Sequence, residues 1–157
     1  MDQQDKQRRK YSLIFLGPFP VGNVSSLRIM SYCKSLVKNG ESVKVLILAP
    51  TSEAKVNKEK TGVFQGVEYT YLTSITWKEN NPLKVVKILY YIIGLFKSLK
   101  QIKQYKTTCL LSYHSNLIAN IFYWFYTRIL KIPFVIDKTE YPYGYIHMSK
   151  IRQFFER

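Results

Sequence analysis

The stretch SLIFLGPFPVGNVSSLRIM, Ser12 to Met30, joins a short apolar run to an amphipathic segment through a turn that holds two glycines. The apolar run from Leu13 to Leu16 predicts a buried strand, and the segment that begins at Ser25 predicts a helix. Strand, glycine turn and helix in this order are typical of the first unit of an α/β sheet, where the turn aims backbone N–H groups at a ligand above the strand. This turn therefore either binds an anion or only reverses the chain, and the residues alone leave both interpretations open.

The chemistry of the turn argues against two common nucleotide sites. Gly17 and Gly22 have the spacing of a P-loop, but Asn23 and Val24 stand where that loop needs a lysine and a hydroxyl to bind phosphates and magnesium. The dinucleotide fingerprint does not fit either, because the next strand ends in Leu48 to Pro50 without a carboxylate for a ribose hydroxyl. We therefore expect neither NTP hydrolysis through this loop nor NAD, and no cofactor.

The same alternation of strands and helices continues along the chain. The first helix is expected from Ser25 or Ser26 as N-cap to Lys38, with Leu27, Met30, Cys33, Leu36 and Val37 on one face and Gly40 as its stop signal. Further strands are expected over 43–48, 67–72, 109–112 and 134–136, further helices over 82–105, 116–130 and 146–157, and a solvated loop over 51–66. Continuous apolar strands joined by helices predict an α/β fold, a Rossmann-like parallel sheet with helices on both faces, over 11–157 after a charged tail at 1–10.

Charge and cysteine content limit the partners and the compartment. The 157 residues include 24 Lys and Arg against 10 Asp and Glu, a formal net charge of +14, so a polyanion or an anionic surface is an expected neighbour. The two cysteines, Cys33 and Cys109, lie in apolar patterns and are expected to be reduced thiols of a cytoplasmic protein. The N-terminus lacks the apolar core of a signal peptide, and the run Ile88 to Phe96 is about half the length that spans a bilayer.

The segment over 82–105 is both basic and apolar. Lys97, Lys100 and Lys103 recur at a step of three residues, which keeps neighbouring charges on one side of a helix. Such a helix either lies on anionic lipid or packs on the core with a solvated lysine side. Nucleic acid is the competing polyanion, but the arginine-rich helix and zinc spacing typical of its readers are missing, so neither nucleic acid nor a metal is expected.

Two longer stretches carry a resemblance to a known family. They are VSSLRIMSYCKSLVKNGESVKVLILAP and CLLSYHSNLIANIFYWFYTRILKIPFVIDKTEYP, which together cover about 60 of the 157 residues. Their helix starts, their strand ending in histidine and their turn before proline resemble the N-terminal domain of the retaining glycosyltransferases of glycosyltransferase family 4. The resemblance implies one half of a GT-B fold, the acceptor side. It also implies that the donor-binding domain with its E-x7-E motif lies outside this chain, which alone would be inactive.

The family resemblance also implies a function. It is transfer of a sugar from a nucleotide-sugar to a glycan acceptor, lipid-linked in many relatives, in the synthesis of a surface polysaccharide or glycolipid at the cytoplasmic face of the membrane. The alternative from another class is a non-catalytic peripheral membrane or partner-binding module. The two differ in whether the protein turns over a nucleotide-sugar.

The resemblance assigns substrate-binding positions to the first turn. Gly17, Gly22, Asn23 and Ser25 match the family's glycine-rich loop, which approaches the donor phosphates, although the family's frequent paired glycines are here Gly22 and Asn23. Arg28 follows one turn into the helix, where it either reaches a phosphate or is a solvated helix residue.

Candidate catalytic residues lie after the later strands. His114 matches the family's histidine after a strand, and it either binds an acceptor hydroxyl or is a satisfied polar residue. Asp137 and Glu140 lie in a loop where many relatives hold a histidine. They either bind sugar hydroxyls and assist removal of the acceptor proton, or pair with Lys138 or Arg152. Neither acid is assigned as a covalent nucleophile.

Overall fold

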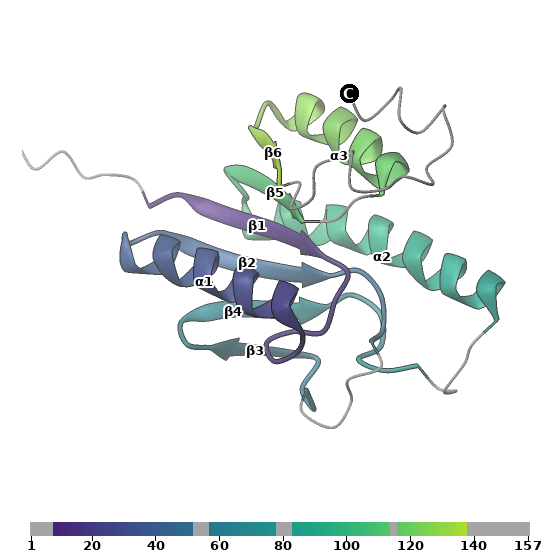
Figure 1. Cartoon of the computed structure of the whole chain (residues 1–157). Helices are drawn as coiled ribbons and strands as arrows, with labels where there is room; N and C mark the ends of the chain where they lie inside the picture. The colour runs from purple at the N-terminus through teal and green to yellow at the C-terminus, as the bar shows by residue number, and fades with distance from the viewer. Residues whose placement is uncertain (1–7, 52–56, 78–82, 114–115, 138–157) are drawn as a thin grey trace, which may run out of the picture.

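The computed structural model describes residues 8–51, 57–77, 83–113 and 116–137. In this part of the chain a six-stranded sheet has the strand order β3-β4-β2-β1-β5-β6 (Figure 1). Neighbouring strands are parallel except for the β3–β4 pair, so the predicted parallel α/β sheet is confirmed. The elements are β1 (Lys10–Phe15), α1 (Val24–Lys38), β2 (Ser42–Ile47), β3 (Thr61–Phe64), β4 (Val67–Tyr71), α2 (Lys84–Tyr105), β5 (Cys109–Tyr113), α3 (Leu117–Leu130) and β6 (Phe134–Ile136).

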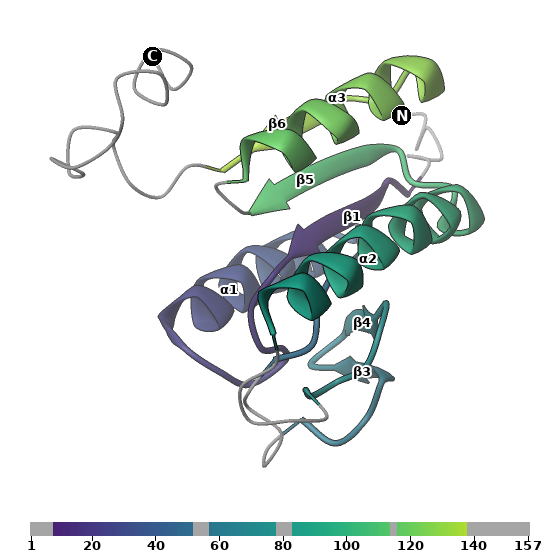
Figure 2. The same cartoon turned by 90° about the vertical axis from the view of Figure 1, so that its right-hand side faces the viewer.

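Helices cover both faces of the sheet, as the sequence predicts. Helix α1 lies on one face, and α2 and α3 lie on the other (Figures 1 and 2). Successive residues of a strand point to opposite faces. Leu13 of β1 therefore packs in the core beneath α1 with Ile29, whereas its neighbour Ile14 packs in the second core with Leu95 of α2 and Tyr123 of α3.

The start of α1 differs from the prediction. The N-cap is Asn23, whose side-chain oxygen accepts the N–H of Ser26 at 3.2 Å, and not Ser25 or Ser26. Ser26 is buried, and its hydroxyl instead donates to the carbonyl of Pro18. This hydrogen bond holds the preceding loop against the helix. Asn23 has an extended backbone, with φ of −83°, so the turn does not use the left-handed angles that asparagine tolerates.

The end of α1 matches the prediction, and its buried face differs from the prediction at Leu27. Gly40 has φ of +83° and donates its N–H to the carbonyl of Val37 at 3.0 Å, as a stop signal does. Leu27, expected on the buried face, is 65% exposed. Met30 and Cys33 are buried as predicted, and Ile29 is buried beside them.

The predicted loop over 51–66 contains a strand, which is a correction. β3 pairs antiparallel with β4, with Phe64 opposite Val67. Gln65 and Gly66 between them have φ of +52° and +81°, the conformation of a two-residue type I′ hairpin turn. β3 forms the edge of the sheet and its residues are partly or fully exposed, so its sequence lacks the apolar run that marks β1 and β2. The helix expected over 146–157 lies outside the described residues.

Helix α2 lies very close to the sheet and is tied to α3. A Cβ added to Gly94 would collide with the carbonyl oxygen of Leu48, so only glycine permits this approach. The hydroxyls of Ser98 and Tyr123 are hydrogen-bonded at 2.7 Å in the buried seam between the helices. The Tyr126 hydroxyl donates to the carbonyl of Leu99 at 3.1 Å. These contacts fix α2 and α3 side by side.

Candidate functional site at the carboxyl edge of the sheet

The strand order reverses between β1 and β5, and this reversal defines the candidate site. β1 pairs with β2 on one side and with β5 on the other, and α1 and α3 leave the sheet on opposite faces (Figures 1 and 2). In the register, Phe15 lies opposite Tyr113, so these two strands end together. Asp137 follows β6 and donates its N–H to the carbonyl of Ser112 at 2.9 Å, which places it at the same edge. Such a switch point is where open α/β sheets bind ligands.

The loop between β1 and α1 is anchored from β4. The Tyr71 hydroxyl accepts the N–H of Phe19 at 3.0 Å and donates to the carbonyl of Phe19 at 2.8 Å, and both residues are fully buried. The side chain of Asn57 makes a second pair of bonds, to the N–H and the carbonyl of Val21, at 3.2 Å and 2.7 Å. The loop is therefore held in one conformation before any ligand arrives.

The two glycines of this loop are required by packing. A Cβ on Gly22 would collide with the Pro18 ring and lie 2.7 Å from the Ser26 hydroxyl, and a Cβ on Gly17 would collide with the Phe15 ring. Gly22, Asn23 and Val24 are exposed, and Ser25 is half-buried. The N–H groups of Val24 and Ser25 in the first turn have no acceptor within the helix, so they point out of its end as an anion-binding group would.

Arg28 and Asp137, two predicted site residues from distant parts of the sequence, meet at this edge. Nη2 of Arg28 lies 3.8 Å from Oδ1 of Asp137, with side chains 42% and 31% exposed. At that distance and exposure the pair contributes little stability and leaves both charges able to bind a ligand. Among the described residues the ion-pair partner of Asp137 is Arg28, and the partners considered from the sequence, Lys138 and Arg152, lie outside them.

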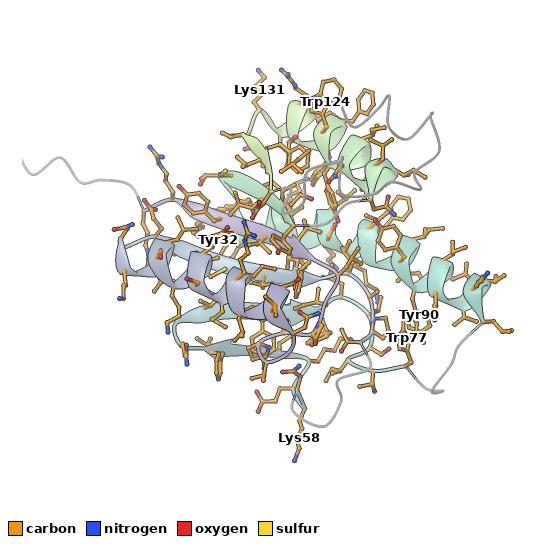
Figure 3. All side chains as sticks on the ribbon, viewed as in Figure 1. Tyr32, Lys58, Trp77, Tyr90, Trp124 and Lys131 are labelled. Atoms are coloured by element: carbon orange, nitrogen blue, oxygen red, sulfur yellow. The ribbon has the colours of Figure 1, made fainter. Side chains whose placement is uncertain are left out.

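Tyr32 orients the arginine and was missed by the sequence analysis. Nε of Arg28 donates to the Tyr32 hydroxyl at 2.7 Å, and the guanidinium lies 5.5 Å from the centre of the Tyr32 ring. This hydrogen bond raises the pKa of Arg28 above its ordinary value, so the arginine stays charged. Tyr32 lies on α1 (Figure 3), and its i, i+4 spacing from Arg28 was the available signal. One carboxylate oxygen of Asp137, Oδ2, is buried and has no hydrogen-bond partner among the described residues.

Two further predicted residues, His114 and Glu140, lie outside the described residues. The described residues that flank His114 in the sequence belong to the end of β5 and the start of α3. β5 ends at Tyr113, whose ring packs on Phe15 with centroids 6.0 Å apart, and Asn116 caps α3 by accepting the N–H of Ala119 at 3.1 Å.

The cysteines and the acids of the described part offer no other reactive centre. Burial raises the pKa of the Cys33 thiol to about 12 and also raises that of Cys109, so neither is a thiolate near neutral pH. Within residues 8–51, 57–77, 83–113 and 116–137, no three His, Cys, Asp or Glu side chains gather as a metal site would need.

Two other features lie away from this edge. A cavity of about 880 Å³ opens at the opposite, amino edge, where Arg8, Arg9 and Lys106 are among its lining residues. Lys97, Lys100 and Lys103 are exposed on α2, which runs from the carboxyl edge toward the amino edge, so they lie toward its far end. None of the helices in the described part has the length and apolarity needed to cross a bilayer.

Comparison with solved structures identifies a protein of similar fold. Sucrose-phosphate synthase from Thermosynechococcus elongatus matches with a TM-score of 0.60 and 10% sequence identity, over 93% of this chain and 37% of that chain. That protein is a GT-B glycosyltransferase. No family model matches the sequence, and the comparison with curated proteins finds no similar sequence. The likeness shows the fold alone: the chain is a Rossmann-like α/β unit, consistent with one half of a GT-B fold.

Proposed function

We propose that this chain is the acceptor-side domain of a retaining glycosyltransferase of family 4. It would transfer a sugar from a nucleotide-sugar to a lipid-linked glycan acceptor in the synthesis of a surface polysaccharide or glycolipid. The donor would be held by a second domain that closes over the carboxyl edge. The site of action would be the cytoplasmic face of the membrane.

The observation that carries this proposal is the loose Arg28–Asp137 pair at the switch point. Sugar-phosphate chemistry needs a cation for the donor phosphates and an oxygen acceptor for sugar hydroxyls, and these two side chains supply both within 3.8 Å of each other. The exposed turn at Gly22 and Asn23 and the free N–H groups that follow it at Ser25 add a second place for a negative group.

The resemblance supplies the remaining roles. His114 would bind an acceptor hydroxyl, and Glu140 or Asp137 would hold sugar hydroxyls and assist removal of the acceptor proton. Gly17 would allow the strand to end directly beneath the substrate. Because the family retains the anomeric configuration without an obvious covalent nucleophile, no acid is given that role.

The test is a transfer assay on the protein encoded by the complete reading frame, with a panel of nucleotide-sugars and a lipid-linked acceptor. Loss of a charge-assisted contact at Arg28→Ala or Asp137→Asn should lower kcat/KM about 10- to 100-fold. Lys34→Ala, an exposed cation on the same helix, is the matched control and should transfer at the wild-type rate. Wild-type rates for the two site variants would contradict the site, and an absence of transfer from every donor would favour the non-catalytic binding module.

A further inference from the structure

The outward side of α2 is apolar over its first half. The exposed side chains are Val85, Ile88, Leu89, Ile92, Ile93 and Phe96, at steps of three and four residues. They lie opposite the inward residues Gly94, Leu95, Ser98 and Ile102. Even Phe96, a large aromatic side chain, is 62% exposed, so the residues of this stripe are not part of the core.

Helix α3 presents a second apolar stripe beside the first. Its exposed side chains are Ile118, Ile121, Trp124, Phe125 and Ile129, with Ile118 76% and Phe125 58% exposed. Trp124 lies on the outer side of α3 (Figure 3). The Ser98–Tyr123 and Tyr126–Leu99 hydrogen bonds hold the two helices side by side (Figure 2), and their two exposed stripes together are hereafter called the α2–α3 face.

The charged side chains of helices α2 and α3 are all positive. The sequence has no Asp or Glu between Glu79 and Asp137. Lys97, Lys100 and Lys103 continue the outward side of α2 beyond Phe96, and all three are exposed. On α3 the guanidinium of Arg128 lies 5.2 Å from the centre of the Trp124 ring. An apolar surface bordered by cations, with an indole at its margin, is the chemistry of helices that lie in a membrane interface.

We infer that the α2–α3 face docks on an anionic phospholipid bilayer, with Trp124 and Phe125 inserted and the lysines of α2 against lipid headgroups. A second copy of the chain would bring like charges together, whereas anionic lipid complements them. Both helices begin at the carboxyl edge, so docking would bring the Arg28–Asp137 edge beside the lipid surface. The docking itself does not depend on the proposed function. Only the statement that a lipid-linked acceptor lies in the same membrane rests on it.

The binding test is co-sedimentation of the chain with vesicles of phosphatidylcholine alone or mixed with phosphatidylglycerol. Binding is expected only with phosphatidylglycerol and should weaken as salt is raised. Phe125→Ser removes a side chain that enters the lipid and should lower the partition coefficient about 10-fold or more. Val63→Ser, an exposed apolar residue on β3, is the matched control and should bind as the wild type does. Equal binding to both vesicles, or equal loss in both variants, would overturn the inference.

A spectroscopic readout locates the inserted surface. The chain has two tryptophans, so Trp77→Phe leaves Trp124 as the single fluorophore. Its emission should shift to the blue on anionic vesicles and be quenched by lipids brominated in their acyl chains. An unquenched Trp124 on bound protein would refute insertion at α3, and a concentration-dependent dimer abolished by Phe125→Ser would assign the face to a second copy.

Failure of docking and failure of the proposed function are distinguishable. With the protein of the complete reading frame, Phe125→Ser should slow transfer to an acceptor in vesicles and leave transfer to a short water-soluble acceptor unchanged. Transfer without vesicle binding would reject docking alone. Vesicle binding without transfer from any nucleotide-sugar would reject the enzymatic function alone.

Discussion

The anchoring of the first loop by Tyr71 makes a quantitative prediction. Tyr71→Phe removes a hydroxyl that satisfies both the N–H and the carbonyl of Phe19 in a fully buried site. Each unsatisfied buried group costs about 1–3 kcal/mol, and the carbonyl less than the N–H, so the free energy of unfolding should fall by about 2–4 kcal/mol. For a chain of this size that loss lowers Tm by roughly 5–15 °C.

Urea unfolding followed by circular dichroism measures this loss as a lower midpoint at unchanged m-value. The matched control is Tyr69→Phe on the same strand, because no hydrogen bond of the Tyr69 hydroxyl is found among the described residues and its loss should cost less than about 0.5 kcal/mol. The amide proton of Phe19 should also exchange faster in Tyr71→Phe. A Tyr71→Phe protein within about 0.5 kcal/mol of the wild type, or equal losses in both variants, would refute the anchoring role.

Other consequences follow from the packing and the ionisation of buried groups. Gly94→Ala places a methyl group against the backbone carbonyl of Leu48, which cannot move aside, so it should destabilise the fold by about 1–3 kcal/mol or more. Gly40→Ala measures the separate cost of placing alanine at a positive φ. An unchanged Tm for Gly94→Ala would contradict the close approach of α2 to the sheet. Burial raises the pKa of Cys33 to about 12 from about 8.5 in the unfolded chain, so the folded state holds the proton more tightly and stability should fall as pH rises above about 8.5, by up to about 1.4 kcal/mol per pH unit. The Cys33 contribution to the pH dependence of the free energy of unfolding should vanish in Cys33→Ala. If Cys33→Ala has the same pH dependence above about pH 8.5 as the wild type, the Cys33 thiol is exposed to water.

The strands β1 and β2 and the end of α1 could be predicted because their patterns are strong. Continuous apolar runs mark strands that are buried on both faces, and Gly40 marks the end of α1. β3 could not be found in this way, because an edge strand needs no apolar face and its only local sign is the Gln65–Gly66 turn. The cap at Asn23 was missed because three polar residues within four positions, Asn23, Ser25 and Ser26, could each cap the helix. The burial of the Ser26 hydroxyl, which bonds to Pro18, could not be read from the sequence.

For the candidate site, the sequence predicts which edge of the sheet its residues share but not the contacts between them. That Arg28 and Asp137 lie at the same edge follows from a parallel sheet, yet their pairing depends on the strand order, which brings the end of β6 within reach of α1. Of the α2–α3 face, the sequence analysis identified the lysines of α2 but not the exposed apolar residues of α3. The segment LIANIFYWFYTRIL is apolar almost throughout, so periodicity does not reveal that Trp124 and Phe125 are the exposed residues.

The most direct test of the carboxyl edge as the binding site is a titration of the isotope-labelled 157-residue chain with a short-chain prenyl diphosphate sugar, followed through backbone amide NMR signals. The largest shifts should fall on Gly22, Asn23, Arg28 and Asp137, and Arg28→Ala should weaken them. Shifts that gather instead at Arg8, Arg9 and Lys106 around the amino-edge cavity would contradict a sugar-phosphate site at the switch point of the sheet.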